Sequence, residues 1–208
     1  MKIKVCGITS FRQMQMLQEL GVDFAGMIFY PGSKRCVREE MYDSQALIRN
    51  LNIKRIGVFV NQPYEEIIKA ISDFDLYAIQ LHGDETDEFC LEFMDKVKVI
   101  KVFRLGNEVE LDTLIAPYQE VCHYFLFDTE TIGYGGSGKK FNWKLLENGM
   151  IKKPFFLSGG IGLDDIESLQ GFTHPYLHAV DVNSKFEVEP GVKDMNMVRS
   201  FLKQLSHG

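Results

Sequence analysis

The chain has 208 residues, which is enough for one domain with a sizeable core and short for two domains that fold independently. Hydrophobic residues make up 45% and charged residues 25% of it, which is typical of a globular protein and argues against a disordered, fibrous or membrane-spanning one. The net charge of −6 comes without a stripe of Lys or Arg, so we expect no nucleic-acid partner and no membrane partner.

The amino terminus and the cysteines predict where the protein works. The first residues enter an alternating pattern directly, without the apolar stretch and cleavage site of a secretory signal, so we expect a cytoplasmic protein. The four cysteines, Cys6, Cys36, Cys90 and Cys122, are widely spaced and form no Cys-x-x-Cys pair. In a reducing cytoplasm we therefore expect free thiols and no metal site. Any one of these cysteines, taken alone, is ordinarily a small buried apolar side chain.

Short apolar runs rich in Val, Ile and Phe recur at fairly even intervals along the chain. The strand candidates span residues 3–6, 24–29, 55–60, 77–81, 98–103, 124–128, 155–157 and 178–182. Stretches with helical periodicity lie between them, which is the pattern of repeated βαβ units. Because parallel strands need cover on both faces, these strands favour a closed (β/α)8 barrel, the TIM barrel, over an open sheet. We expect one α/β barrel domain over residues 1–208.

Helix-capping signals follow several strand candidates. Ser10 precedes an apolar helical face and Gly21 follows it, so they predict the two ends of a first helix. Pro63 is predicted to lie in the first turn of a helix, and Thr86 and Asp194 are predicted to cap two later helices. Shorter helical signals lie at residues 142–147 and 163–169.

Unusual polar residues stand at the carboxyl ends of the strand candidates. They are Cys6, Gly7, residues 33–35, Asn61, residues 82–84, Arg104, Asp128, residues 158–160 and residues 181–184. A barrel of this kind carries its chemistry on the loops at these ends. We therefore expect the polar residues to converge on one mouth.

An ordered set of motifs resembles the phosphoribosylanthranilate isomerase family. Residues 4–9, KVCGIT, look like the family's Lys-x-Cys-Gly-Ile/Leu-Thr opening, and residues 29–35, FYPGSKR, are similar to its Phe-x-Pro-x-Ser-x-Arg loop. Matching motifs then follow in family order at residues 57–61, 80–85, 128–129, 135–139, 158–161 and 191–194. Each motif alone is weak, but the ordered set covers most of the chain and is highly specific.

The resemblance implies a cofactor-free isomerase of tryptophan biosynthesis. Its small-molecule substrate would be N-(5-phosphoribosyl)anthranilate, which undergoes an Amadori-type aldose-to-ketose rearrangement. By resemblance, Cys6 is the general base and Asp128 the general acid. Ring opening needs a proton on the ring oxygen, and enolamine formation needs removal of the proton at the adjacent carbon. The surroundings must then keep Asp128 protonated and Cys6 partly ionised.

The same resemblance implies binding roles for further residues at the mouth. Arg35 would bind the anthranilate carboxylate, which suits a planar bidentate donor. His82 and Asp181 are candidates for positioning the ribose hydroxyls, and a structural hydrogen-bonding role for His82 is equally open. The backbone at the ends of the last two strands would bind the phosphate, through Gly159, Gly160, Asn183 and Ser184. The chain departs from the family's common Ser-Ser-Gly here, because Lys185 stands where the glycine is usual.

Alternative functions can be weighed on the same residues. Residues 133–140, GYGGSGKK, almost match a nucleotide-binding P-loop, but Lys140 lacks the hydroxyl that binds magnesium, and the stretch fits the family's glycine-rich sixth loop. Another phosphosugar isomerase or epimerase is possible on the same barrel, but Arg35 would lack its aromatic carboxylate there. Cys6 and Asp128 together argue against a non-catalytic phosphate sensor. The sequence does not decide between a monomer and a homodimer.

Overall fold

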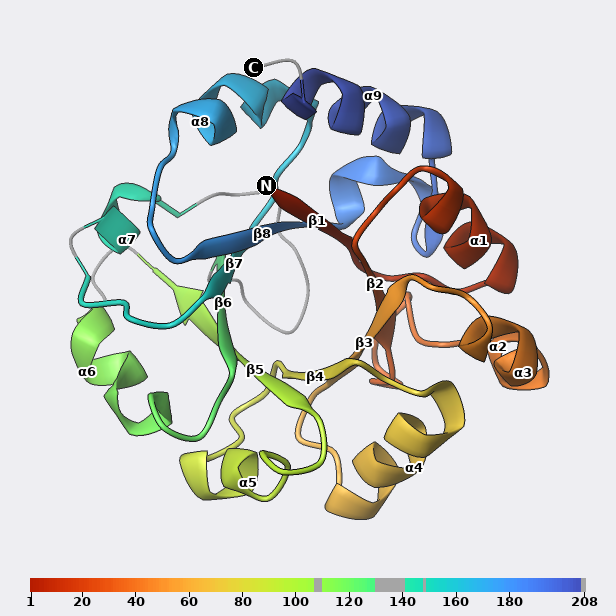
Figure 1. The fold of residues 1–208 in the computed structure, drawn as a ribbon, viewed down its shortest axis with the longest axis horizontal. Coiled ribbons are helices and arrows are strands. Elements are labelled where there is room, and N and C mark those ends of the chain that lie inside the picture. Colours follow the sequence, from red (N-terminus) through yellow and green to blue (C-terminus); the bar gives the residue numbers. More distant parts are fainter. Residues whose placement is uncertain (107–109, 130–140, 148, 207–208) are drawn as a thin grey trace.

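Eight parallel strands form a closed barrel in this computed structural model, which describes residues 1–106, 110–129, 141–147 and 149–206. The strands are β1 (Lys2–Val5), β2 (Phe24–Ile28), β3 (Lys54–Phe59), β4 (Ala78–Leu81), β5 (Lys98–Leu105), β6 (Tyr124–Thr129), β7 (Phe155–Leu157) and β8 (Leu177–Val182). They pair in chain order, and β1 pairs with β8 to close the barrel (Figure 1). The predicted TIM barrel is confirmed, and each strand end differs from its prediction by at most two residues.

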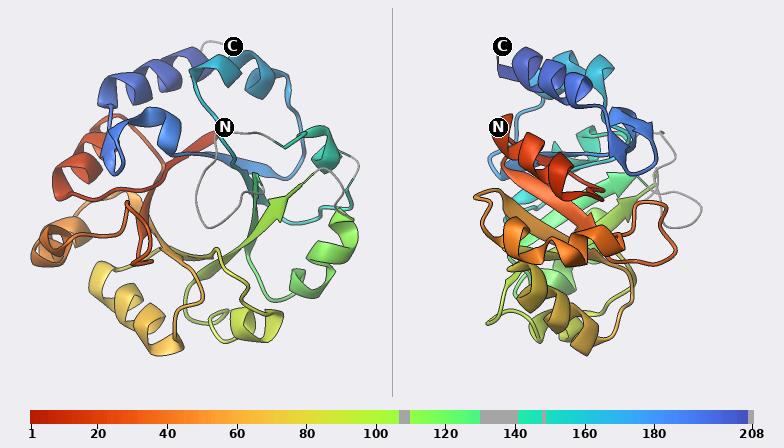
Figure 2. Two further views of the ribbon diagram at one scale, coloured as in Figure 1. Left: turned by 180° about the vertical axis from the view of Figure 1, so that it is seen from behind. Right: turned by 90° about the vertical axis from the view of Figure 1, so that its right-hand side faces the viewer.

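Helices surround the strands in a ring, which is visible from both faces of the barrel (Figures 1 and 2). They are α1 (Phe11–Glu19), α2 (Glu39–Asp43), α3 (Gln45–Arg49), α4 (Tyr64–Phe74), α5 (Asp87–Leu91), α6 (Leu111–Ile115), α7 (Lys144–Glu147), α8 (Ile166–Gly171) and α9 (Met195–Ser206). The short helices α2, α3 and α6 are absent from the sequence prediction, because five residues show little periodicity and none of the three begins with a side-chain cap. Within the described ranges, no helix has the length and apolar character needed to cross a membrane.

Local side-chain hydrogen bonds start the helices where the capping signals predict. Ser10 Oγ accepts from the Gln13 backbone N–H, and Thr86 Oγ1 accepts from that of Phe89. Asp194 caps α9 in the same way. Pro63 is a correction to the prediction, because its extended ψ of 148° places it before α4 rather than inside the first turn.

Inward-facing side chains fill the barrel in layers, because alternate residues of each strand point to the same side. One cluster of interior residues is apolar and consists of Phe24, Ile56, Ala78, Ile100, Val102, Leu126, Phe156 and Ala179. Nearer the carboxyl ends of β1, β4 and β8, these strands carry Lys4, Gln80 and Asp181, all buried. The barrel interior is therefore apolar at one end and polar toward the carboxyl ends of the strands.

A small antiparallel hairpin follows β8 and is missing from the sequence prediction. It consists of β9 (Glu187–Glu189) and β10 (Val192–Lys193). The hairpin holds buried Lys193 beside Glu187. It thus brings two charged groups to the rim of the polar end.

Candidate active site

A cavity of about 330 Å³ opens at the carboxyl ends of the strands. All nine predicted site residues line it: Cys6, Arg35, His82, Asp128, Gly159, Gly160, Asp181, Asn183 and Ser184. Arg104 lines it as well, as its place at a strand end predicts. Asn61 and Asp84 are not among the lining residues; Asn61 Oδ1 accepts from the Asp84 backbone N–H at 2.7 Å and shapes a loop instead. Most of the predicted polar positions therefore converge, as the barrel topology requires.

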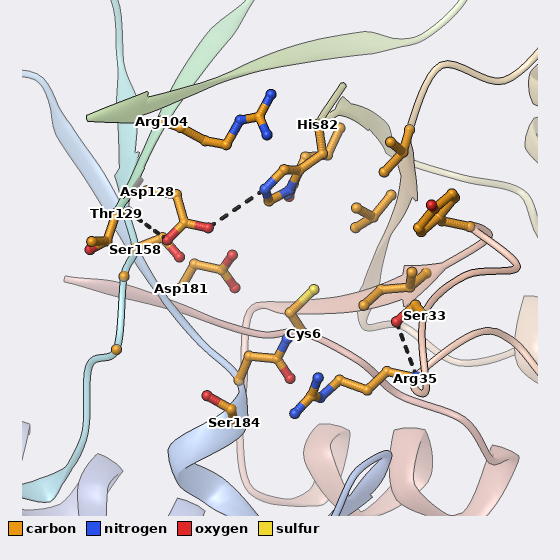
Figure 3. A pocket seen from close by; sticks show the side chains of 18 of the residues that line it. Cys6, Ser33, Arg35, His82, Arg104, Asp128, Thr129, Ser158, Asp181 and Ser184 are labelled. Carbon is orange, nitrogen blue, oxygen red and sulfur yellow. Dashed lines mark hydrogen bonds and ion pairs between the residues drawn. The ribbon is translucent and has the colours of Figure 1, made fainter. Parts of the chain in front are cut away.

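Asp128 is the last but one residue of β6 and lies in surroundings that favour its protonated form. Its Oδ1 accepts from the Thr129 backbone N–H at 2.8 Å, and its Oδ2 lies 3.6 Å from His82 Nε2 (Figure 3). Burial raises the pKa of Asp128 to about 6, and the nearby charge of Asp181 acts in the same direction. A carboxyl of this kind retains a protonated fraction near neutral pH, which a general acid needs.

Cys6 follows β1 directly and is 4% exposed. Its sulfur packs against the bare backbone of Gly26, where a Cβ would lie 2.7 Å from Sγ. Burial raises the pKa of the Cys6 thiol, whereas the cations of Lys4 and Lys193 act in the opposite direction. The two cations therefore lower the energy of the thiolate at a position that desolvation alone would keep neutral.

A fully buried cation, Lys4, organises the polar layer below the cavity. Lys4 Nζ donates to Asp181 Oδ2 at 2.8 Å and to Gln80 Oε1 at 2.7 Å. The other carboxylate oxygen, Asp181 Oδ1, is buried and has no hydrogen-bond partner in the described part of the chain. Asp181 lies between Asp128 and Cys6 in the view of Figure 3, and its charge affects the pKa of both groups.

Sequence reasoning missed Lys4 and Gln80 as site residues, although both lie in the motifs that carry the resemblance. One signal could have found them. Each is a long polar residue in a strand of a parallel barrel, which covers its strands on both faces, and such a residue needs a buried partner.

Arg35 already has a carboxylate partner within the chain. Its Nε and Nη2 donate to Glu187 at 2.9 and 2.7 Å, and Lys193 Nζ donates to Glu187 Oε1 at 2.7 Å. Burial raises the pKa of Glu187, but the hydrogen bonds from Arg35 and Lys193 outweigh it, so the net pKa is lowered and Glu187 is ionised. The edge of the guanidinium that remains for a ligand is the one formed by Nη1 and Nη2.

The predicted phosphate loops have the backbone that close approach of an anion requires. Gly159 and Gly160 have φ of 102° and 65°, and a Cβ on Gly159 would lie 2.3 Å from Thr129 Oγ1. Ser184 begins a 3₁₀ turn over residues 184–186. Lys185 has no positive φ, so this loop accommodates a lysine where the family pattern has glycine.

The family is decided by comparison with known proteins. A sequence model of the N-(5'-phosphoribosyl)anthranilate (PRA) isomerase family matches residues 3–204. The chain belongs to this isomerase family. A Phocaeicola vulgatus protein named N-(5'-phosphoribosyl)anthranilate isomerase is 42% identical over 208 residues, covering 99% of this chain and 98% of that protein. A Parabacteroides distasonis protein of the same name is 37% identical over 209 residues, with 100% and 94% coverage.

Solved structures of phosphoribosylanthranilate isomerases agree with this family assignment. The Thermotoga maritima enzyme superimposes with a TM-score of 0.85 at 34% identity, over 100% of this chain and 99% of that one. A phosphoribosylanthranilate isomerase in complex with reduced 1-(o-carboxyphenylamino)-1-deoxyribulose 5-phosphate gives a TM-score of 0.81 at 31% identity and the same coverage. The predicted family, barrel and isomerase function in tryptophan biosynthesis are confirmed. The P-loop-like residues 133–140 of this isomerase lie outside the described residues.

Proposed function

We propose that the chain isomerises N-(5'-phosphoribosyl)anthranilate to 1-(2-carboxyphenylamino)-1-deoxyribulose 5-phosphate with Asp128 as general acid and Cys6 as general base. The observation that carries the assignment is the pairing, in one cavity, of a carboxyl with a pKa of about 6 and a buried thiol that faces cations. A carboxyl that retains a proton and a thiol whose ionised form is stabilised by cations can serve as proton donor and proton acceptor in one site.

Asp128 and Cys6 each carry out one proton transfer, and a tautomerisation follows. Asp128 gives its proton to the ring oxygen while the bond from that oxygen to C1 breaks, and the nitrogen lone pair forms a C1=N iminium. The Cys6 thiolate then removes the proton from C2. The electron pair of that C–H bond forms the C1=C2 double bond and neutralises the iminium, giving an enolamine that tautomerises to the ketone.

Each charged end of the substrate has matching groups among the residues that line the cavity. The anthranilate carboxylate would accept from the Nη1–Nη2 edge of Arg35, which Glu187 holds in place from its other edge. The phosphate would accept from backbone N–H groups at residues 159–160 and 183–184. The unpartnered Asp181 Oδ1 would accept from a hydroxyl of the opened ribose.

The proposal includes one catalytic domain over residues 1–208 that needs no cofactor and works in the cytoplasm as a monomer or a homodimer. A structure of the Thermotoga maritima isomerase, 31% identical with a TM-score of 0.81, is described as monomers generated from a dimeric enzyme, which supports keeping the homodimer. Light scattering of the purified chain distinguishes the two states by mass.

The direct test is an assay of the purified chain with N-(5'-phosphoribosyl)anthranilate, following the loss of its fluorescence. We expect turnover without added metal or nucleotide. Phosphorylated ketoses and aldoses that lack the aromatic carboxylate serve as parallel substrates. Turnover of one of these, with none of the anthranilate compound, would show that the substrate is assigned wrongly.

Arg35→Ala is expected to raise KM by roughly ten- to a hundredfold and to change kcat much less, since a hydrogen bond to a charged group is lost far from the reacting carbons. Glu187 keeps its bond to Lys193 in this variant, so the loop stays charged and paired. Steady-state kinetics measure both constants. Arg12→Ala, on the exposed side of α1, is the matched control. An unchanged kcat/KM in Arg35→Ala would remove Arg35 from substrate binding.

A further inference from the structure

A line of buried polar contacts crosses the barrel and ends beside the proposed acid. Lys4 Nζ, paired with Asp181, donates to Gln80 Oε1 at 2.7 Å. Gln80 Nε2 lies 3.0 Å from His82 Nδ1, and His82 Nε2 lies 3.6 Å from Asp128 Oδ2. Gln80 lies in β4 and His82 directly follows that strand, so the two residues are two positions apart and lie on the same side of the sheet. Lys4 is fully buried and Gln80 is 1% exposed, so water does not compete for the contact between them, whereas the side chains of His82 and Asp128 are 21% and 23% exposed.

The hydrogen bond from Lys4 to Gln80 determines which atom donates and which accepts in each later contact. A lysine ammonium has only donors, so the atom of Gln80 that faces Lys4 must be the amide oxygen. The amide NH₂ of Gln80 then faces His82, and Nδ1 of His82 must accept from it. In a neutral imidazole with an accepting Nδ1, the proton is on Nε2.

The surroundings of His82 keep its ring neutral. Burial lowers the pKa of His82 to about 3, and the cations of Lys4, Arg104 and Lys101 act in the same direction. His82 therefore has neither a free lone pair to receive a proton from Asp128 nor a second proton to give. It can only donate a hydrogen bond from Nε2 into the cavity.

We propose that Gln80 is a positioning residue that holds His82 as the neutral tautomer with its proton on Nε2, where His82 donates a hydrogen bond to the ionised Asp128 carboxylate. The hydrogen bond to Asp128 rests on the proposed function, because it forms only after Asp128 has acted as general acid and lost its proton. The distance of 3.6 Å is longer than a hydrogen bond. A small closure would make the bond when negative charge develops on Oδ2, which favours departure of the proton.

The tautomer can be measured directly by ¹⁵N NMR of the histidine side chains in the full chain, from roughly pH 5 to pH 8. We expect His82 to stay neutral throughout, with the proton on Nε2. The signals of His82 are identified by their loss in His82→Asn. A His82 that carries its proton on Nδ1, or that titrates in this range, would overturn the proposal.

Two substitutions of Gln80 separate positioning from packing. Gln80→Met keeps the length of the side chain but removes the donor to Nδ1, so the single tautomer is expected to be lost. Gln80→Glu is nearly isosteric and has acceptors only, so Nδ1 is expected to become protonated. In Gln80→Met we expect kcat to fall roughly tenfold while KM changes little, because the lost contact acts on Asp128 after its proton leaves.

His123 is an internal control in the same spectra, because its Nδ1 accepts from the Val99 backbone N–H at 3.1 Å and does not depend on Gln80. Its signals are expected to be unchanged in both variants. Gln170→Met, on the exposed side of α8, is the control for kinetics.

If Gln80→Met leaves the His82 tautomer unchanged, Gln80 does not set it. If the tautomer changes and kcat does not, His82 does not assist Asp128. The NMR result does not require turnover, so a failure of the proposed function is recognised separately.

Discussion

Asp128→Asn is expected to have opposite effects on activity and stability. It removes the transferable proton and should lower kcat by on the order of 10²–10⁴-fold. The same change should raise the free energy of unfolding above pH 6 by up to about 3 kcal/mol, because the pKa of Asp128 rises from 3.8 to about 6 on folding. The folded state binds the proton more tightly than the unfolded chain, so wild-type stability falls as the pH rises from 3.8 to about 6. Asparagine has no such dependence.

Urea unfolding of both proteins at several pH values measures this difference. The advantage of Asp128→Asn should be absent near pH 4, should grow up to about pH 6 and should then stay constant. Asp112→Asn is the matched control, because Asp112 Oδ1 also accepts a backbone hydrogen bond, from Met150 N–H, on an exposed surface. A pH-independent stability difference would show that Asp128 is not held protonated by the fold, and undiminished turnover would remove it as the acid.

Cys6→Ser should lower kcat by a similar factor, on the order of 10²–10⁴-fold, because a serine hydroxyl ionises far above neutral pH and cannot accept the C2 proton. The substitution is nearly isosteric, so we expect the barrel to stay folded. Cys36→Ser, at a half-buried cysteine outside the cavity, is the control and should retain its activity. Near-full turnover in Cys6→Ser, where chemistry limits the rate, would make Cys6 a packing residue.

The pH dependence of kcat/KM in the wild type gives a second measurement of the ionisation of Asp128 and Cys6. The pKa of Asp128, about 6, lies below that of the Cys6 thiol, which burial raises above its ordinary value. The productive form, with Asp128 protonated and Cys6 ionised, is then a minor but constant fraction between the two pKa values. We expect kcat/KM to fall below about pH 6 and again on the alkaline side. The alkaline limb reports Cys6 and should be missing in Cys6→Ser, whereas the substrate phosphate also titrates on the acid side.

Local signals explain why so much of the fold follows from the sequence. Strand runs such as residues 55–60 and caps such as Ser10 and Thr86 depend on neighbouring residues, so they can be recognised without a structure. The short helices α2 and α3 and the β9–β10 hairpin lack such signals. Their positions depend on packing against the barrel and on loop closure.

The sequence by itself determined the family, the barrel and most of the residues at its mouth, because carboxyl ends of parallel strands meet at one face whatever the intervening loops are. Only the tertiary structure decided the partners of these residues. Lys4 meets Gln80 and Asp181 across separations of 76 and 177 residues, and Arg35 meets Glu187 across 152. No periodicity in the sequence predicts contacts between residues that are so far apart along the chain. The pKa of Asp128 and the tautomer of His82 depend on these contacts and on burial, so they follow from the folded barrel alone.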